Sequence, residues 1–228
     1  MKKNIKRIAG WGIVAALLAA ALILLTAASY VSSLDVSKLG EPMAQPTRIL
    51  DRNGEEIYKL SVRKFEPVSI ERMPSQLLEA IVAVEDHRYY EHPGVDIVSI
   101  ARALYVDLKE RDLAEGASTI TQQLARNAFL SLDKTFDRKL KEAAYALKIE
   151  MTYDKQQVLE LYLNTIYFGS GAWGVQAASQ TYFGKDVAEL TLEEAALIAG
   201  LPQAPSRYSP FNNPELAVER RNVVLLRM

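Results

Sequence analysis

The stretch MPSQLLEAIVAVED, residues 73–86, spaces its apolar side chains as an α-helix does. At about 100° per residue, one arc of this helix collects four apolar side chains: Leu77, Leu78, Ile81 and Val82. Glu85 falls on the same arc. A carboxylate on an apolar stripe loses hydration, which raises its pKa and makes it a candidate proton acceptor or donor. The sequence fits equally well a helix that ends before Glu85 and leaves this residue on the surface.

Helical spacing continues beyond this stretch and predicts a mainly α-helical fold. The expected helices lie near residues 95–113, 119–129, 133–151, 155–164, 174–183, 192–199 and 215–228. Strand patterns are confined to residues 47–50 and 56–62, which flank the Asn53-Gly54 pair typical of a tight turn. We therefore expect one short β-hairpin before a helical domain.

An uncharged stretch runs from Ile8 to Leu34 and is almost wholly apolar or small up to Ala28. A helix that spans a bilayer needs about 20 such residues, so this stretch is long enough to be a transmembrane anchor. The preceding cations predict a cytoplasmic N-terminus, with everything after Asp35 outside the cell membrane: Lys2, Lys3, Lys6 and Arg7. A cleaved signal peptide is the alternative, and the length of the apolar run favours the single-pass anchor.

Composition narrows the class of protein. With 49% hydrophobic and 24% charged residues, the chain of 228 residues is neither disordered nor of low complexity. The absence of cysteine excludes disulfides, thiolate metal sites and cysteine nucleophiles. His87 and His92 stand about 140° apart on a helix, so they are not expected to share a metal ion. From Asp35 onward acidic residues outnumber basic ones, 28 to 23, which argues against nucleic-acid binding.

A second carboxylate, Glu142, lies opposite the main apolar stripe of the helix expected at 133–151. Arg138 and Lys139 share its side of that helix. An ordinary surface ion pair, worth less than ~1 kcal/mol, would explain this arrangement. A carboxylate ringed by cations in a partly apolar groove would instead suit a phosphate-bearing ligand.

The segment GASTITQQLARN, residues 116–127, combines small residues with the hydroxyls of Ser118 and Thr119 at an expected helix start. Free backbone N–H groups and the helix dipole could hold an anion there. Three polar side chains then share one helix face: Gln123, Arg126 and Asn127. A simple capped helix start fits equally well. Without a Walker-type lysine or a GxGxxG sequence, a nucleotide is not expected.

Five segments, in this order, resemble the signatures of the peptidoglycan glycosyltransferases, family 51 of the glycosyltransferases. They lie at residues 85–94, 116–123, 138–142, 159–185 and 192–202. The resemblance covers roughly Ser69 to the end and extends to the N-terminal anchor. Tyr89 stands where the family usually has Phe, and Arg126 stands where Lys is common. A guanidinium can bind phosphate bidentately, but it is not equivalent to an ammonium.

This resemblance implies an all-helical, lysozyme-like lobe with a small membrane-proximal jaw, built from segments such as 97–108 and 129–136. It also implies the reaction, in which lipid II is polymerised into glycan strands. The 4-hydroxyl of an incoming lipid II attacks the anomeric carbon of the growing strand, and undecaprenyl pyrophosphate leaves with inversion. The implied partners are lipid II, the growing strand, the membrane, and proteins of cell-wall synthesis or division.

The resemblance also assigns roles to residues. Glu85 is the expected catalytic base, because an alcohol is a poor nucleophile until its proton is taken. Glu142, the second expected catalytic residue, would orient the neighbouring cations or help hold a divalent cation, Mg²⁺ or Mn²⁺. The leaving pyrophosphate would be stabilised by Arg138, Lys139, Gln123, Arg126 and Asn127. Contacts that position the substrate or the base are expected from Asp86, Ser118 and Thr119.

The expected organisation has three parts. Residues 1–34 form a basic tail and anchor, residues 35–68 a linker with the hairpin, and residues 69–228 the glycosyltransferase domain. The helical pattern at residues 225–228 stops without a cap, which predicts a longer parent chain. That parent would be a bifunctional penicillin-binding protein rather than a monofunctional glycosyltransferase.

Two other classes of function stay open. One is a hydrolase or lytic transglycosylase on a lysozyme-like scaffold, with Glu85 as the acid. The cations around Glu142 argue against it, because a cleaved glycan presents no pyrophosphate. The other is a non-catalytic membrane scaffold for cell-wall assembly, in which Glu85 would be dispensable.

Overall fold

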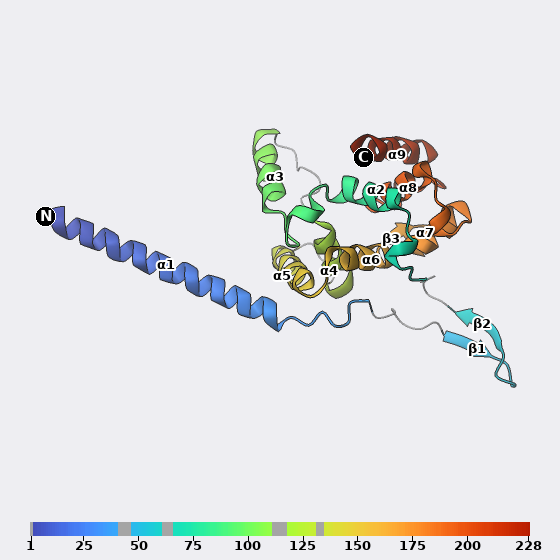
Figure 1. The fold of residues 1–228 in the computed structure, drawn as a ribbon, viewed down its shortest axis with the longest axis horizontal. Coiled ribbons are helices and arrows are strands. Elements are labelled where there is room, and N and C mark those ends of the chain that lie inside the picture. The colour runs from blue at the N-terminus through green and yellow to red at the C-terminus, as the bar shows by residue number, and fades with distance from the viewer. Residues whose placement is uncertain (1, 41–46, 61–65, 111–117, 131–134) are drawn as a thin grey trace.

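The computed structural model describes residues 2–40, 47–60, 66–110, 118–130 and 135–228. Within these ranges the fold is mainly α-helical, as predicted (Figure 1). The helices are α1 (Lys2–Ser33), α2 (Ser75–Glu85), α3 (Ile97–Glu110), α4 (Ile120–Phe129), α5 (Phe136–Thr152), α6 (Lys155–Thr165), α7 (Val175–Phe183), α8 (Leu192–Gly200) and α9 (Pro214–Arg227). Short 3₁₀ turns lie at η1 (Ile70–Arg72), η2 (Tyr89–Glu91) and η3 (Val187–Glu189). Parts of several expected segments lie outside the described residues: 61–62, 111–113, 116–117 and 131–134.

The length of helix α2 shows whether Glu85 lies within a helix, which the sequence leaves open. It continues through Glu85 and has Asp86 as its C-cap, whose N–H donates to the carbonyl of Val82. The alternative in which the helix ends earlier and exposes Glu85 is therefore wrong. Leu77 and Ile81, from the predicted apolar arc, are fully buried.

The strands form two small antiparallel pairs. Strands β1 (Thr47–Leu50) and β2 (Glu56–Leu60) pair on either side of the Asn53-Gly54 turn. A second pair, β3 (Tyr167–Gly169) with β4 (Ala172–Trp173), lies where no strand is expected from the sequence. These strands are too short to show an alternating pattern, and the turn between them depends on backbone with positive φ at residues 169–171.

The core lies between two groups of helices. Helices α2, α8 and α9 pack against one another, and α4 packs against both α5 and α6. Tyr162 on α6 and Leu124 on α4 are fully buried where α4 and α6 meet. Val36, Leu39 and Val68, which fall in the expected linker, are buried in this same core. The segment after α1 is therefore partly integrated into the domain.

Helix α1 extends away from the helical body, and its C-terminal end lies beside α5 (Figure 1). Lys148 on α5 donates to the carbonyl of Ser32 at 3.1 Å. The leucines at positions 17, 18, 22, 24 and 25 are each 64–69% exposed. Among the residues that the structure describes, no helix meets both the length and the apolarity required of a membrane span.

Candidate active site

A cleft of about 520 Å³ opens at the C-terminal end of α2. Its walls come from α2, α3, the segment before α4, and the end of α9. The lining residues include Glu85, Asp86, His87, Asp96, Arg102, Ser118, Thr119 and Arg227. Four of the predicted site residues therefore face one cavity, although the chain between Asp86 and Ser118 is long.

Glu85 lies in this cleft with its carboxylate partly buried. Burial raises its pKa above the ordinary value of 4.5. Gln123 opposes this effect by donating from Nε2 to Glu85 Oε2 at 2.8 Å, and the charges of Arg220, Arg227 and Arg126 oppose it further. A carboxylate held in this way can accept a proton from a bound alcohol more readily than an ordinary surface glutamate.

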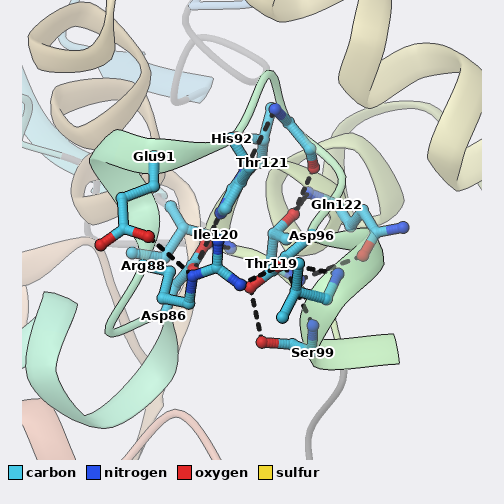
Figure 2. A network of polar contacts seen from close by, with 12 residues as sticks. Asp86, Arg88, Glu91, His92, Asp96, Ser99, Thr119, Ile120, Thr121 and Gln122 are labelled. Carbon is cyan, nitrogen blue, oxygen red and sulfur yellow. Dashed lines mark hydrogen bonds and ion pairs between the residues drawn. The ribbon is translucent and has the colours of Figure 1, made fainter. Parts of the chain in front are cut away.

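Asp86 ties the end of α2 to the start of α4 (Figure 2). Its carboxylate lies 3.0 and 3.1 Å from His92 Nε2 and accepts the N–H of Ile120 at 3.1 Å. Thr119, the N-cap of α4, forms a reciprocal capping box with Gln122. Asp86 is only 7% exposed, and its carboxylate is occupied by these contacts. Its role is therefore to connect the two segments of the chain.

The loop that follows Asp86 is fixed by a second set of polar contacts (Figure 2). Arg88 pairs with Glu91 at 2.8 Å and with the buried Asp96 at 3.3 Å. Asp96 accepts from the hydroxyl and the N–H of Ser99 at the start of α3. The hydroxyl of Thr119 donates to the carbonyl of Gly94 at 2.5 Å. One wall of the cleft is thereby anchored to both α3 and α4.

Glu142 forms a separate cluster on α5. Its side chain is fully buried, with one oxygen paired to Arg138 Nη1 and the other accepting from Lys139 Nζ at 2.8 Å. Lys139 Nζ also donates to Ser118 Oγ at 2.6 Å. The interpretation of Glu142 as an ordinary surface ion pair is therefore wrong. Ser118 connects the cation cluster to the cleft wall.

The residues around Glu142 do not fit a resident divalent cation. Mg²⁺ and Mn²⁺ need several free oxygen ligands, whereas both oxygens of Glu142 face cationic groups that would repel a metal ion. Among the described residues, no group of three or more His, Asp or Glu side chains is placed to hold a metal.

Comparison with known proteins shows which family the chain belongs to. The family model described as Transglycosylase matches residues 53–228, which is most of the chain. The chain belongs to the transglycosylase family. Penicillin-binding protein 1A of Aquifex aeolicus is 50% identical over 184 residues, covering 81% of this chain and 25% of that protein. Penicillin-binding protein 1F of Bacillus subtilis is 50% identical over 179 residues, covering 78% and 25%.

A crystal structure of penicillin-binding protein 1A from Haemophilus influenzae is also similar, with 30% identity and a TM-score of 0.45. The alignment covers 82% of this chain and 18% of that structure. This transglycosylase chain thus spans about a quarter of the length of the curated relatives named above.

The candidate site divides the predicted polar residues into two groups. Glu85, Gln123 and Arg126 lie together, because Gln123 bonds to Glu85 and Arg126 acts on its charge. Arg138 and Lys139 instead surround Glu142. Gln123 was expected on the pyrophosphate side, but its amide nitrogen contacts the carboxylate of the expected base. The side chain of Asn127 is exposed on α4.

Several residues of the candidate site were not predicted as functional. His92 falls inside the first signature and is not expected to share a metal ion with His87, but no role is predicted for it; its partner is Asp86. Tyr162 donates to Gln123 Oε1 at 3.2 Å, and Arg227 donates to the carbonyl of Val84 at 3.1 Å beside the cleft. Neither contact has a local sequence pattern, because the partners are far apart in the chain.

Proposed function

We propose that this chain is the glycosyltransferase part of a longer penicillin-binding protein and polymerises lipid II into peptidoglycan strands. One observation carries the proposal: a partly buried glutamate with a raised pKa faces a cleft whose wall also contacts the cations around the buried Glu142. The base and the cations are distinct groups, as a reaction with an alcohol nucleophile and a pyrophosphate leaving group requires.

In the proposed reaction, Glu85 accepts the proton of the acceptor's 4-hydroxyl as that oxygen attacks the anomeric carbon of the donor strand. The new C–O bond forms as the bond from the anomeric carbon to the pyrophosphate oxygen breaks on the opposite face, so the configuration inverts. The electron pair of the broken bond leaves with undecaprenyl pyrophosphate. Gln123 keeps the Glu85 carboxylate oriented during the transfer.

The leaving pyrophosphate gains negative charge and needs cations rather than a proton. Arg138 and Lys139 supply them, with Ser118 directing Lys139 toward the cleft wall. Glu142 is too buried and too fully paired to be a second base. Its role is to hold the two cations in place. The divalent cation that the resemblance implies stays a prediction.

The membrane is the expected location of a lipid-linked substrate. The exposed leucines of α1 suit a lipid environment better than water. Helix α3 exposes Ile97, Val98 and Tyr105, which fits the jaw expected beside the bilayer. We also propose a single-pass topology with the catalytic domain outside the cell membrane, and contacts with cell-wall synthesis or division proteins.

The test uses purified protein in detergent with labelled lipid II, and separates polymer on a gel. Glu85→Gln should lower the polymerisation rate by about 10²–10⁴-fold, since it removes the base and keeps the shape. Glu79→Gln, on the exposed side of the same helix, is the matched control and should polymerise normally.

The rival functions give different results in the same preparation. Release of soluble muropeptides from sacculi, lost in Glu85→Gln, would favour a lytic enzyme. Equal behaviour of Glu85→Gln and wild type in every assay would favour a scaffold. Either result would overturn the polymerase proposal.

A further inference from the structure

Gln123 bridges the expected base and a buried tyrosine from a third helix. Its Nε2 lies 2.8 Å from Glu85 Oε2, and its Oε1 lies 3.2 Å from the hydroxyl of Tyr162. The three residues come from α2, α4 and α6 and form one chain of hydrogen bonds. Tyr162 is fully buried and lies at the far end of this chain from Glu85.

The direction of each hydrogen bond follows from chemistry. An ionised carboxylate can only accept, so the amide nitrogen of Gln123 must face Glu85. The amide oxygen then faces Tyr162, whose hydroxyl must be the donor. Burial and the nearby charge of Glu85 raise the pKa of Tyr162 well above its ordinary value of 10, so its phenol remains protonated and able to donate.

From this geometry we infer that Tyr162 is a positioning residue, which fixes the amide of Gln123 so that it donates to the Glu85 base. The inference rests on the proposed function. Without the phenol, the amide is free to rotate, and its oxygen can turn toward the carboxylate. Glu85 would then lose its neutral donor and hold a proton to higher pH.

Other charged groups also act on Glu85 and must remain in place. Arg126 reaches it from α4, Arg220 and Arg227 from α9, and Asp86 follows it directly in the chain. His87, Asp96 and Arg102 line the same cleft. The single hydroxyl proton of Tyr162 is donated to Gln123 and therefore to none of these groups. Tyr162→Phe removes this donor and keeps every charged group around Glu85.

The experiment compares the pH dependence of lipid II polymerisation in the full chain for wild type, Tyr162→Phe and Gln123→Met. A base must be ionised to act, so the rate rises as pH increases through the pKa of Glu85. Tyr162→Phe should move this acidic limb about one unit toward higher pH, which is roughly a tenfold lower rate on the limb.

Gln123→Met keeps the volume of the side chain and lacks both amide groups, so it should shift the limb in the same direction. The double variant should shift it no further than Gln123→Met alone, because Tyr162 acts only through Gln123. Additive shifts would overturn the inference, as would an unmoved limb in either single variant. Gln123→Met decides the matter if Tyr162→Phe does not fold.

Tyr89→Phe is the matched control. Tyr89 is equally buried and donates to the carbonyl of Lys155 at 2.6 Å, in the same core but outside this chain of hydrogen bonds. The acidic limb of the pH–rate profile of Tyr89→Phe should coincide with that of wild type. A shift as large as that of Tyr162→Phe would show that loss of any buried phenol suffices.

A second measurement separates this inference from the proposed function. The Glu85 carboxyl resonance can be followed by ¹³C NMR in glutamate-labelled protein and assigned by its absence in Glu85→Gln. Tyr162→Phe should raise the pH at which this resonance titrates, even if wild type makes no polymer. An unchanged titration would refute the positioning role, whatever reaction the chain catalyses.

Discussion

His92 Nε2 lies 3.0 Å from Asp86 Oδ1, although the two residues stand six positions apart in the chain. Nδ1 of the same ring accepts the N–H of Gly94 at 3.2 Å, so the proton is on Nε2 and is donated to the carboxylate. Asp86 also accepts the N–H of Ile120. The histidine thus supports the residue that joins the expected base to the helix carrying Gln123.

Loss of this imidazole should cost stability. His92→Ala leaves the Asp86 carboxylate and the Gly94 N–H short of a partner in a buried site, which we expect to lower the free energy of unfolding by about 1–3 kcal/mol. Urea unfolding followed by circular dichroism measures the change. His87→Ala removes an exposed histidine from the same loop and should stay within about 0.5 kcal/mol of wild type. Equal losses of stability in His92→Ala and His87→Ala would show that the contact between His92 and Asp86 does not stabilise the fold.

Two carboxylates on α5 provide a matched test of buried against exposed ion pairs. Glu142→Gln should lower the free energy of unfolding by about 2–3 kcal/mol, because Arg138 and Lys139 lose the charge between them. The cost stays below that of a fully buried pair since Lys139 is 46% exposed. Asp137→Asn breaks the exposed pair with Lys141 and should cost less than ~1 kcal/mol. A reversed order would contradict the burial of Glu142.

The base should reduce stability at neutral pH. Burial raises the pKa of Glu85, so the folded state binds this proton more tightly than the unfolded chain does. Ionised Glu85 therefore costs stability above the raised pKa, and this cost vanishes below the ordinary value of 4.5. Glu85→Gln should then melt higher than wild type at neutral pH, by about 2–4 °C for each kcal/mol of relief.

The melting temperature of Glu85→Gln should approach that of wild type in acid. Glu79→Gln, exposed on the same helix, should match wild type at both pH values. A lower melting temperature for Glu85→Gln than for wild type at neutral pH would contradict this prediction. It would mean that the neighbours of the Glu85 carboxylate stabilise its charge more than burial destabilises it.

Gly94 combines a positive φ with close packing. A Cβ there would lie 2.8 Å from the carbonyl oxygen of Ala146, whereas a Cβ on Gly171, which also has positive φ, would meet nothing within 4 Å. Gly171→Ala should cost only the backbone strain, about 1–2 kcal/mol. Gly94→Ala should cost clearly more in thermal unfolding and should also slow polymerisation, since Thr119 bonds to the Gly94 carbonyl. Equal losses of stability in the two variants would mean that α5 can move away from the added Cβ without lowering the free energy of unfolding.

Local patterns explain what could be predicted. The apolar arc of α2 placed Glu85 correctly, since helix periodicity relates residues three and four positions apart wherever the helix lies. The start of α4 near Thr119 and the cation pair beside Glu142 were recognised for the same reason. The β3–β4 pair was missed because two- and three-residue strands have no detectable alternation.

The sequence by itself determined the helical class, the position of Glu85 on an apolar stripe, and the family signatures, since each depends on residues close in the chain. The tertiary structure alone decided how these parts meet. It brought Gln123 and Tyr162 to Glu85, joined Asp86 to His92 and Ile120, and buried Glu142 completely. Contacts such as that between Tyr162 and Gln123 depend on how α4 packs on α6, and distant residues meet only when the whole core has packed.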